Sequence, residues 1–157
     1  MSDWLQKLYY LGFTEDNIFK IIKALVPVGG TFVDIGANIG LFTCVIAHHV
    51  GANGSVIAFE PMRENLVPLY NNINLNKLEN IEVKEVALSN TPGEFNLYVP
   101  QTHPQGSTGC TQVWNPGDWL SIGSASATTL DLIFQNQRLD FIKIDTEGHE
   151  LKNFRRS

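Results

Sequence analysis

The first residues whose types and spacing could do chemistry are two glycines and a carboxylate that follow a short apolar segment. The segment Asp34-Ile35-Gly36-Ala37-Asn38-Ile39-Gly40 lies between a predicted strand, residues 31–35, and a predicted helix that begins at residue 41. In open α/β sheets, such a strand-to-helix turn is where nucleotide-like ligands bind. Gly36 and Gly40 allow a tight turn, and the N–H groups at the start of the helix favour a carboxylate or a phosphate. We therefore predict a ligand site here; the alternative is an ordinary strand-to-helix turn.

The spacing of the glycines separates two kinds of cofactor. A dinucleotide fingerprint that starts at Gly36 requires glycines at positions 38 and 41, where the chain has Asn38 and Leu41. The spacing resembles instead the Asp-x-Gly-x-Gly-x-Gly loop of class I methyltransferases that use S-adenosylmethionine, with Asn38 in place of the middle glycine. An NAD-dependent oxidoreductase is thus the least favoured of the enzyme hypotheses.

A second carboxylate closes the next predicted strand, residues 55–59. Glu60 follows the glycine loop by about 20 residues, the distance at which an acidic residue binds ribose in nucleotide-binding sheets. A carboxylate there can accept both ribose hydroxyls of an adenosyl group through charge-assisted hydrogen bonds. Taken alone, Glu60 fits a solvated carboxylate at a strand end. Together with the loop, it predicts a ribose contact.

The second dense polar cluster is Asp145-Thr146-Glu147-Gly148-His149-Glu150, which follows a predicted strand at residues 139–144. Because the carboxyl ends of parallel strands meet at one edge of a sheet, we expect Asp145 in the same crevice as the loop. His149 is suited to general base catalysis near neutral pH, and Glu147 or Asp145 could hold it or a substrate. The ligands are too few to name a metal, and none is expected. Acidic caps at the start of a helix are the alternative.

The elements that position these residues alternate between short apolar strands and amphipathic helices. This order predicts βαβ units and a mostly parallel sheet in an α/β domain. Pro68 should make the predicted helix at 64–75 begin later or kink. Trp114 and Trp119 could line an acceptor pocket, or they could anchor their own loop to the core. The other expected elements are helices at about 15–26, 41–50 and 128–136, strands at 81–88 and 94–99, and a shorter helix before residue 14.

Composition and charge exclude several classes of protein. The chain has 157 residues, a net charge of −5 and one adjacent basic pair, Arg155-Arg156, which disfavours a nucleic-acid-binding module. The longest apolar stretch, residues 39–47, is about half the length of a membrane span. The sequence does not begin with a basic segment followed by an apolar one, as a secretory signal would. Two cysteines, Cys44 and Cys110, are too few for a disulfide framework. These features favour a cytoplasmic location.

Five groups of residues, in order along the chain, resemble the FkbM-type methyltransferases. They span residues 32–150, which is most of the sequence. The matching groups are Phe32-Val33-Asp34-Ile35-Gly36-Ala37-Asn38-Ile39-Gly40; Phe59-Glu60-Pro61 with Asn65; Ala87-Leu88-Ser89 followed by Gly93; Thr129-Leu130-Asp131; and Asp140-Phe141-Ile142-Lys143-Ile144-Asp145 with Glu147-Gly148-His149-Glu150.

The resemblance implies a Rossmann-like class I fold, a three-layer sandwich, and methyl transfer from S-adenosyl-L-methionine to a hydroxyl of a saccharide or natural-product acceptor. Asp145 would face the reacting centre, and Glu147 and His149 would bind or deprotonate the acceptor. The residues implied in cofactor binding are Asp34, Gly36, Ala37, Asn38 and Gly40 for the methionine part, Glu60 and Pro61 for the ribose, and Val86 and Ala87 for the adenine.

We expect one methyltransferase domain over residues 1–157. Its parts are N-terminal helices at 1–30, a cofactor-binding core at 31–99, an irregular excursion at 100–127, and a last part at 128–157 with a helix, the fourth parallel strand and the polar cluster. The family's sheet continues with further strands, so this chain is expected to be truncated. The alternative function is therefore a non-catalytic cofactor-binding or assembly module that self-associates through the exposed edge of its sheet.

Overall fold

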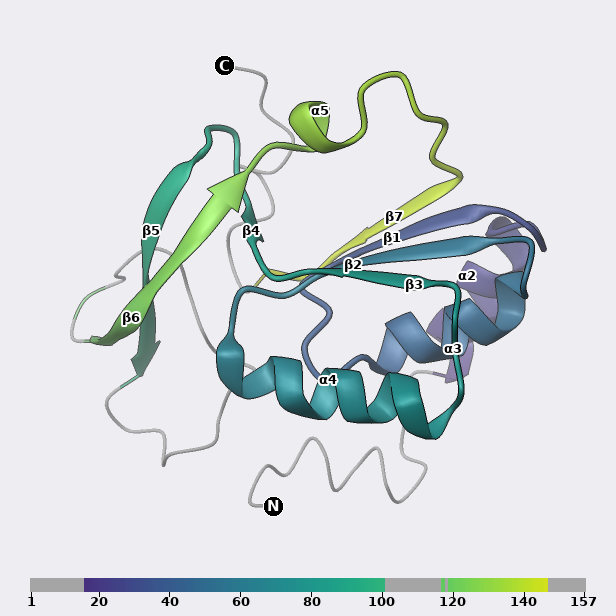
Figure 1. Cartoon of the computed structure of the whole chain (residues 1–157), viewed down its shortest axis with the longest axis horizontal. Helices are drawn as coiled ribbons and strands as arrows, with labels where there is room; N and C mark the ends of the chain where they lie inside the picture. The colour runs from purple at the N-terminus through teal and green to yellow at the C-terminus, as the bar shows by residue number, and fades with distance from the viewer. Residues whose placement is uncertain (1–15, 101–116, 118, 147–157) are drawn as a thin grey trace.

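A four-stranded parallel sheet forms the centre of the protein, as seen in a computed structural model that describes residues 16–100, 117 and 119–146 (Figure 1). Its strand order, β3-β2-β1-β7, means that the chain builds outward from β1 and then crosses to the other side of β1. This is the order 3-2-1-4 of a doubly wound fold, whose ligand crevice lies at the switch point between β1 and the fourth strand. The strands are β1 (Thr31–Ile35), β2 (Ser55–Phe59), β3 (Ile81–Lys84) and β7 (Phe141–Ile144).

Three helices cover one face of this sheet: α2 (Asp16–Leu25), α3 (Leu41–Val50) and α4 (Arg63–Leu75), which lie below it in Figure 1. Alternate residues of the strands meet them, since successive side chains of a strand point to opposite faces. Phe32 and Val56 pack with Ile46 of α3, and Ala58 packs with Leu69 of α4. The helices predicted after residues 14, 40 and 63 are thus confirmed in the described residues.

Pro68 lies inside α4, which runs without interruption from Arg63 to Leu75. The expectation that the helix begins later is wrong, because α4 starts one residue before the predicted position. Leu66, Leu69 and Ile73 are buried against the sheet and hold the helix in place. Packing thereby overrides the loss of one backbone hydrogen bond at the proline.

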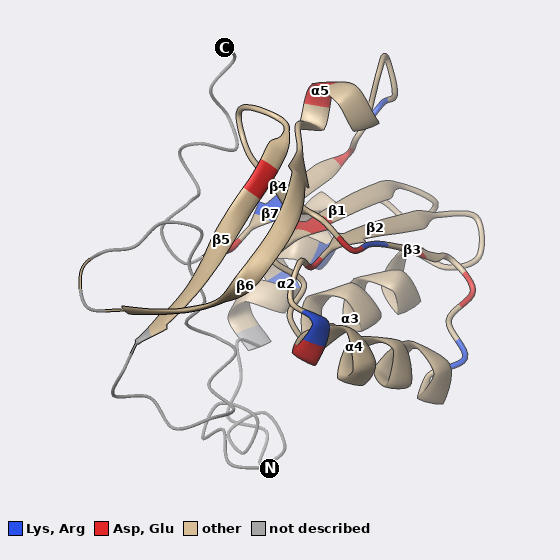
Figure 2. Ribbon diagram, turned by 60° about the vertical axis from the view of Figure 1, so that its left-hand side comes forward, with Lys and Arg blue, Asp and Glu red and all other residues tan. Residues whose placement is uncertain are grey.

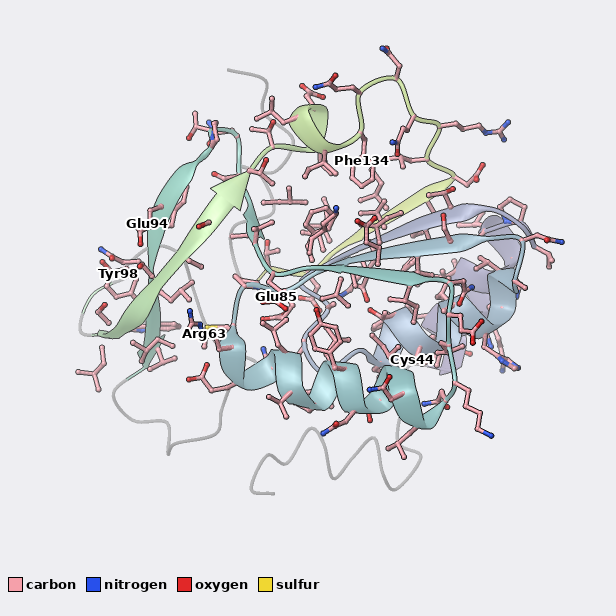
Figure 3. All side chains as sticks on the ribbon, viewed as in Figure 1. Cys44, Arg63, Glu85, Glu94, Tyr98 and Phe134 are labelled. Carbon is pink, nitrogen blue, oxygen red and sulfur yellow. The ribbon has the colours of Figure 1, made fainter. Side chains whose placement is uncertain are left out.

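The opposite face of the sheet is covered by the short helix α5 (Leu130–Ile133) and the residues next to it. Phe134 points from below α5 toward the sheet in Figure 3, where its ring meets Phe59 edge to face at 6.1 Å between centroids. Thr129 caps α5, accepting a hydrogen bond from the N–H of Leu132 at 3.2 Å. The helix expected at 128–136 is present, but it begins at Leu130 and ends at Ile133.

A second, three-stranded sheet stands beside the first, with order β4-β6-β5 (Figure 2). One expectation is wrong here: residues 81–88 do not form one strand, because β3 ends at Lys84 and β4 joins the other sheet. The last part of the excursion predicted at 100–127 lies in a ten-residue strand. The strands are β4 (Ala87–Leu88), β5 (Gly93–Pro100) and β6 (Trp119–Thr128).

The β5–β6 hairpin is joined to the core at two points near the carboxyl edge of the parallel sheet. Ala87 of β4 pairs with Ala127 of β6, in parallel. Leu97 and Ala125 pack against Met62, which precedes α4. The hairpin therefore rests on the two turns that follow β2 and β3.

Several predicted features lie outside the described residues: the helix before residue 14, Trp114 and the segment from Glu147 to the end. In the part of the chain that the structure describes, no helix is both long and apolar enough to cross a membrane.

Candidate functional site

The loop between β1 and α3 follows a path that its three special residues make possible. Gly36, Asn38 and Gly40 all have positive φ, at 77°, 51° and 88°. Glycine adopts this region freely, and asparagine is one of the few other residues that enter it readily. Asn38 can thus replace the middle glycine of the loop without changing its course.

At Gly36 the loop also passes very close to the end of β7. A Cβ atom on Gly36 would lie 1.9 Å from the carbonyl oxygen of Asp145, and the N–H of Asp145 donates to Ile35 at 3.0 Å. Only glycine fits at this position. The predicted meeting of the loop with Asp145 at one edge of the sheet is therefore what the structure shows.

Glu60 holds this loop to the turn after β2. Its Oε2 accepts a hydrogen bond from the N–H of Asn38 at 2.7 Å, and its Oε1 accepts from the N–H of Met62 and from Nδ2 of Asn65, both at 3.0 Å. The side chain is 4% exposed. Burial raises the pKa of Glu60 more than the three hydrogen bonds lower it, and the nearby Asp34 adds to the rise.

Asp34 lies beneath the loop and is fully buried. Its Oδ2 accepts a hydrogen bond from the hydroxyl of Thr43 in α3 at 2.6 Å. Its Oδ1 has no hydrogen-bond donor in good geometry, and its charge is balanced by Nζ of Lys143 at 3.0 Å. Both carboxylate oxygens of Asp34 are thus turned into the protein and support the loop from below.

Asp145 is the exposed member of the group. Its side chain is 64% accessible, and its Oδ2 lies 3.8 Å from Nζ of Lys143. Of the three residues predicted for catalysis, Asp145 is in place at the carboxyl edge, whereas Glu147 and His149 lie outside the described residues.

The remaining predicted cofactor residues surround the same edge. Ala37 is buried, and its N–H donates to the carbonyl of Phe59 at 3.0 Å. Gly40 precedes α3, where a Cβ atom would lie 2.5 Å from Cδ1 of Leu69. Pro61 follows Glu60 in the turn, half-buried. Val86 is half-buried beside the core, and Ala87 is buried in β4.

Three residues of the site were missed as functional residues by the sequence analysis. Thr43 and Lys143 are the partners of Asp34, and Asn65 is a partner of Glu60. Lys143 carried a signal, because a lysine in an otherwise apolar strand must find a partner when buried. Asn65 belonged to the group that resembles the family but was given no role, and Thr43 carried no signal beyond its place in a predicted helix.

The described residues support neither a metal site nor a nucleophilic cysteine at Cys44. Among the described residues, no three His, Cys, Asp or Glu side chains stand close enough together to hold a metal ion. Burial, together with Asp34, raises the pKa of the Cys44 thiol to about 11. A thiol with that pKa stays protonated at neutral pH and is a poor nucleophile.

Comparison with known proteins identifies the family. The Methyltransferase FkbM domain matches residues 34–156, from the buried aspartate of β1 almost to the last residue. The chain belongs to the FkbM methyltransferase family. No curated protein matches it in sequence. The FkbM domain match includes every site residue described above.

Two solved structures that resemble this chain each cover less than half of it. A SAM-dependent methyltransferase from Aquifex aeolicus is 26% identical, covers 46% of this chain and 38% of its own, with a TM-score of 0.42. An rRNA methylase from Streptococcus thermophilus is 17% identical, covers 44% of this chain and 40% of its own, with a TM-score of 0.39. The chain spans about two fifths of the length of these proteins. The family assignment rests on the domain match.

Proposed function

We propose that the protein binds S-adenosylmethionine at the carboxyl edge of its parallel sheet and transfers the methyl group to a hydroxyl oxygen. The observation that carries this proposal is the buried Glu60, which joins the glycine loop to the turn after β2. The glycine loop and the carboxylate of Glu60 lie at the ends of neighbouring strands, where doubly wound folds bind adenosyl groups.

Glu60 fits a ribose contact by its hydrogen-bond capacity. An ionised carboxylate has about four acceptor positions, two on each oxygen. Met62 and Asn65 fill both positions on Oε1, whereas Oε2 accepts from Asn38 alone among the described residues. One position on Oε2 thus remains for a ribose hydroxyl, at a carboxylate that the backbone already holds in place.

The loop and α3 suit the methionine part. Gly40 provides no side chain to cap α3, so the first N–H groups of the helix can bind a carboxylate. Gly36 and Asn38 keep bulk out of the crevice beside Asp145. Val86, on the turn after β3, and Ala87, the first residue of β4, would line the adenine.

When bound, S-adenosylmethionine supplies a methyl group on a good leaving group. The protein then needs to align an acceptor oxygen with that group and remove its proton, so that positioning supplies much of the rate. Asp145, which is exposed at the rim, would orient or deprotonate the acceptor, with Glu147 and His149 as the other candidate bases. A general base adds roughly 10²–10⁴-fold.

The acceptor in this proposal is a saccharide or another small hydroxyl compound. Trp119, half-buried at the start of β6, is on the hairpin that lies beside the carboxyl edge of the parallel sheet. Aromatic rings offer apolar faces on which sugar rings pack. The same proposal places the protein in the cytoplasm, where its free Cys44 stays reduced.

The proposal is tested by incubating the protein with S-adenosylmethionine carrying a labelled methyl group and a panel of saccharides and small alcohols. We expect label in a hydroxyl-containing acceptor, and loss of that label on Asp145→Asn. Transfer only to amines or thiols would contradict O-methylation.

A second candidate is a cofactor-binding module that assembles without catalysis. It is favoured by β7, which in the described residues pairs only with β1 and leaves its other edge open. Such a module would bind S-adenosylhomocysteine and elute as a dimer or larger species, with no transfer in the assay above. A monomer that transfers methyl groups would exclude it.

A further inference from the structure

Lys143 is a lysine in the interior of the site, directly beside Asp34 in the register of the two parallel strands. Its side chain is only 14% exposed and lies on the helix-covered face of the sheet. The ammonium stands 5.1 Å from the centre of the Phe42 ring in α3, which adds a cation–π contact.

The ammonium of Lys143 meets three groups: one in β1, one in the loop after β1 and one directly after β7. It forms an ion pair with Oδ1 of Asp34 at 3.0 Å, donates a hydrogen bond to the carbonyl of Gly36 at 3.1 Å, and lies 3.8 Å from Oδ2 of Asp145. Of these three oxygens, the carbonyl of Gly36 accepts the hydrogen bond, and the two carboxylates are ion-pair contacts. The first two contacts fix the beginning of the glycine loop, and the third draws the exposed carboxylate of Asp145 toward that loop.

Neutralising Asp34 does not by itself account for this arrangement. A buried ion pair is often replaceable by apolar residues without loss of stability. Lys143, however, also holds a loop carbonyl and the nearest candidate base. Both belong to the proposed cofactor site, and neither is needed to neutralise Asp34.

We propose that Lys143 is a positioning residue that joins Asp34, the Gly36 carbonyl and Asp145 into one unit, and so holds the glycine loop in the shape that binds the cofactor. This rests on the proposed function. Lys143 itself need not touch the cofactor, because it acts through the loop and through Asp145.

The test separates positioning from mere charge balance. Lys143→Met alone leaves Asp34 buried and unpaired, which threatens folding. The double variant Asp34→Asn/Lys143→Met removes both charges together and keeps an acceptor for Thr43. The matched control is Lys84→Met, on β3 of the same sheet, whose ammonium contacts the exposed Glu82.

Binding of S-adenosylhomocysteine is measured by calorimetry, and folding by circular dichroism and thermal unfolding. We expect the folded double variant to bind at least about tenfold more weakly than wild type, which corresponds to about 1.4 kcal/mol, while Lys84→Met binds as wild type does. A folded double variant with wild-type affinity would overturn the proposal, since charge balance would then be the only role of Lys143.

If the double variant does not fold, Lys143→Arg decides the question. It keeps a positive charge beside Asp34 but replaces the compact ammonium that reaches the Gly36 carbonyl. Weaker binding by the folded arginine variant supports positioning, and unchanged binding refutes it. Wild-type protein that binds no S-adenosylhomocysteine would instead refute the proposed function.

Discussion

Glu60 brings the donors of two turns to a single carboxylate at the edge of the sheet. Because it is buried, its pKa is raised, and in the free protein it keeps its proton to a higher pH than an exposed glutamate would. A ribose hydroxyl donates best to the ionised form. Folding and cofactor binding therefore favour opposite protonation states of this one residue.

This opposition predicts two pH dependences of opposite sign. As the pH rises from 4.5, the ordinary value, through the raised pKa of Glu60, the free energy of unfolding should lose the contribution of this residue, because only the folded state still holds the proton. Over the same window the affinity for S-adenosylhomocysteine should rise. Glu60→Gln should flatten both profiles, whereas Glu64→Gln, at an exposed carboxylate nearby, should change neither. Parallel profiles for wild type and Glu60→Gln would contradict this account.

Asn38 allows a test of whether its backbone or its side chain matters. Asn38→Gly keeps the N–H that reaches Glu60 and tolerates the φ of 51°, so the stability should change by less than about 1 kcal/mol. Asn38→Val should cost about 1–2 kcal/mol, because a β-branched residue is strained at positive φ. Urea unfolding measures both. Equal losses in the two variants would show that the side chain, and not the loop conformation, is what the site uses.

The sequence predicted the residues at the edge better than their partners. Glycines, an asparagine and two carboxylates at strand ends follow local rules, so Gly36, Glu60 and Asp145 were found from spacing alone. The pairing of Asp34 with Thr43 and Lys143 depends on which strands become neighbours, and Lys143 is 109 residues from Asp34. Nothing local signals that contact.

At the scale of elements, α4 contains a residue that weakens it. Pro68 cannot donate to the carbonyl of Glu64, and its ring crowds that turn. Pro68→Ala should therefore raise the free energy of unfolding by about 1–3 kcal/mol. Val67→Ala, at an exposed neighbouring position, should change it by less than about 0.5 kcal/mol. Destabilisation by Pro68→Ala in urea unfolding would mean that the proline ring contributes packing that outweighs the lost hydrogen bond.

Met62 connects the β5–β6 hairpin to the turn that contains Glu60. Leu97→Ala should remove packing on Met62, cost about 2–3 kcal/mol, and weaken S-adenosylhomocysteine binding, because the N–H of Met62 holds Glu60. Leu120→Ala, at an exposed position in β6, is the matched control. If Leu97→Ala lowers the stability but leaves the affinity unchanged, packing of the hairpin on Met62 does not affect binding.

The division between β3 and β4 shows where local patterns fail. Residues 81–88 carry a strand-like sequence throughout, yet the chain leaves the parallel sheet after Lys84 and enters the second sheet at Ala87. This division depends on β6, which comes more than thirty residues later and pairs with both β4 and β5. The small residues of β6 at Ser124 to Ala127 have low strand propensity, so the sequence did not predict a strand there.

For the whole molecule, topology determines where the site is. The chain builds β1, β2 and β3 in one direction and then places β7 on the other side of β1. The glycine loop and Asp145 meet at that change of direction, and Glu60 lies at the end of the neighbouring strand. The alternation of strands and helices predicted a parallel sheet whose carboxyl ends share one edge, but the strand order was not predicted.

Titration of the purified protein with S-adenosylhomocysteine in a calorimeter tests the central claim most directly, that Glu60 and the glycine loop form an adenosyl site. We predict saturable binding of one molecule per chain, weakened about tenfold or more by Glu60→Gln, because a hydrogen bond to a charged group is worth about 1.5–3 kcal/mol. The absence of binding at high micromolar protein, or equal affinity in wild type and Glu60→Gln, would contradict the account.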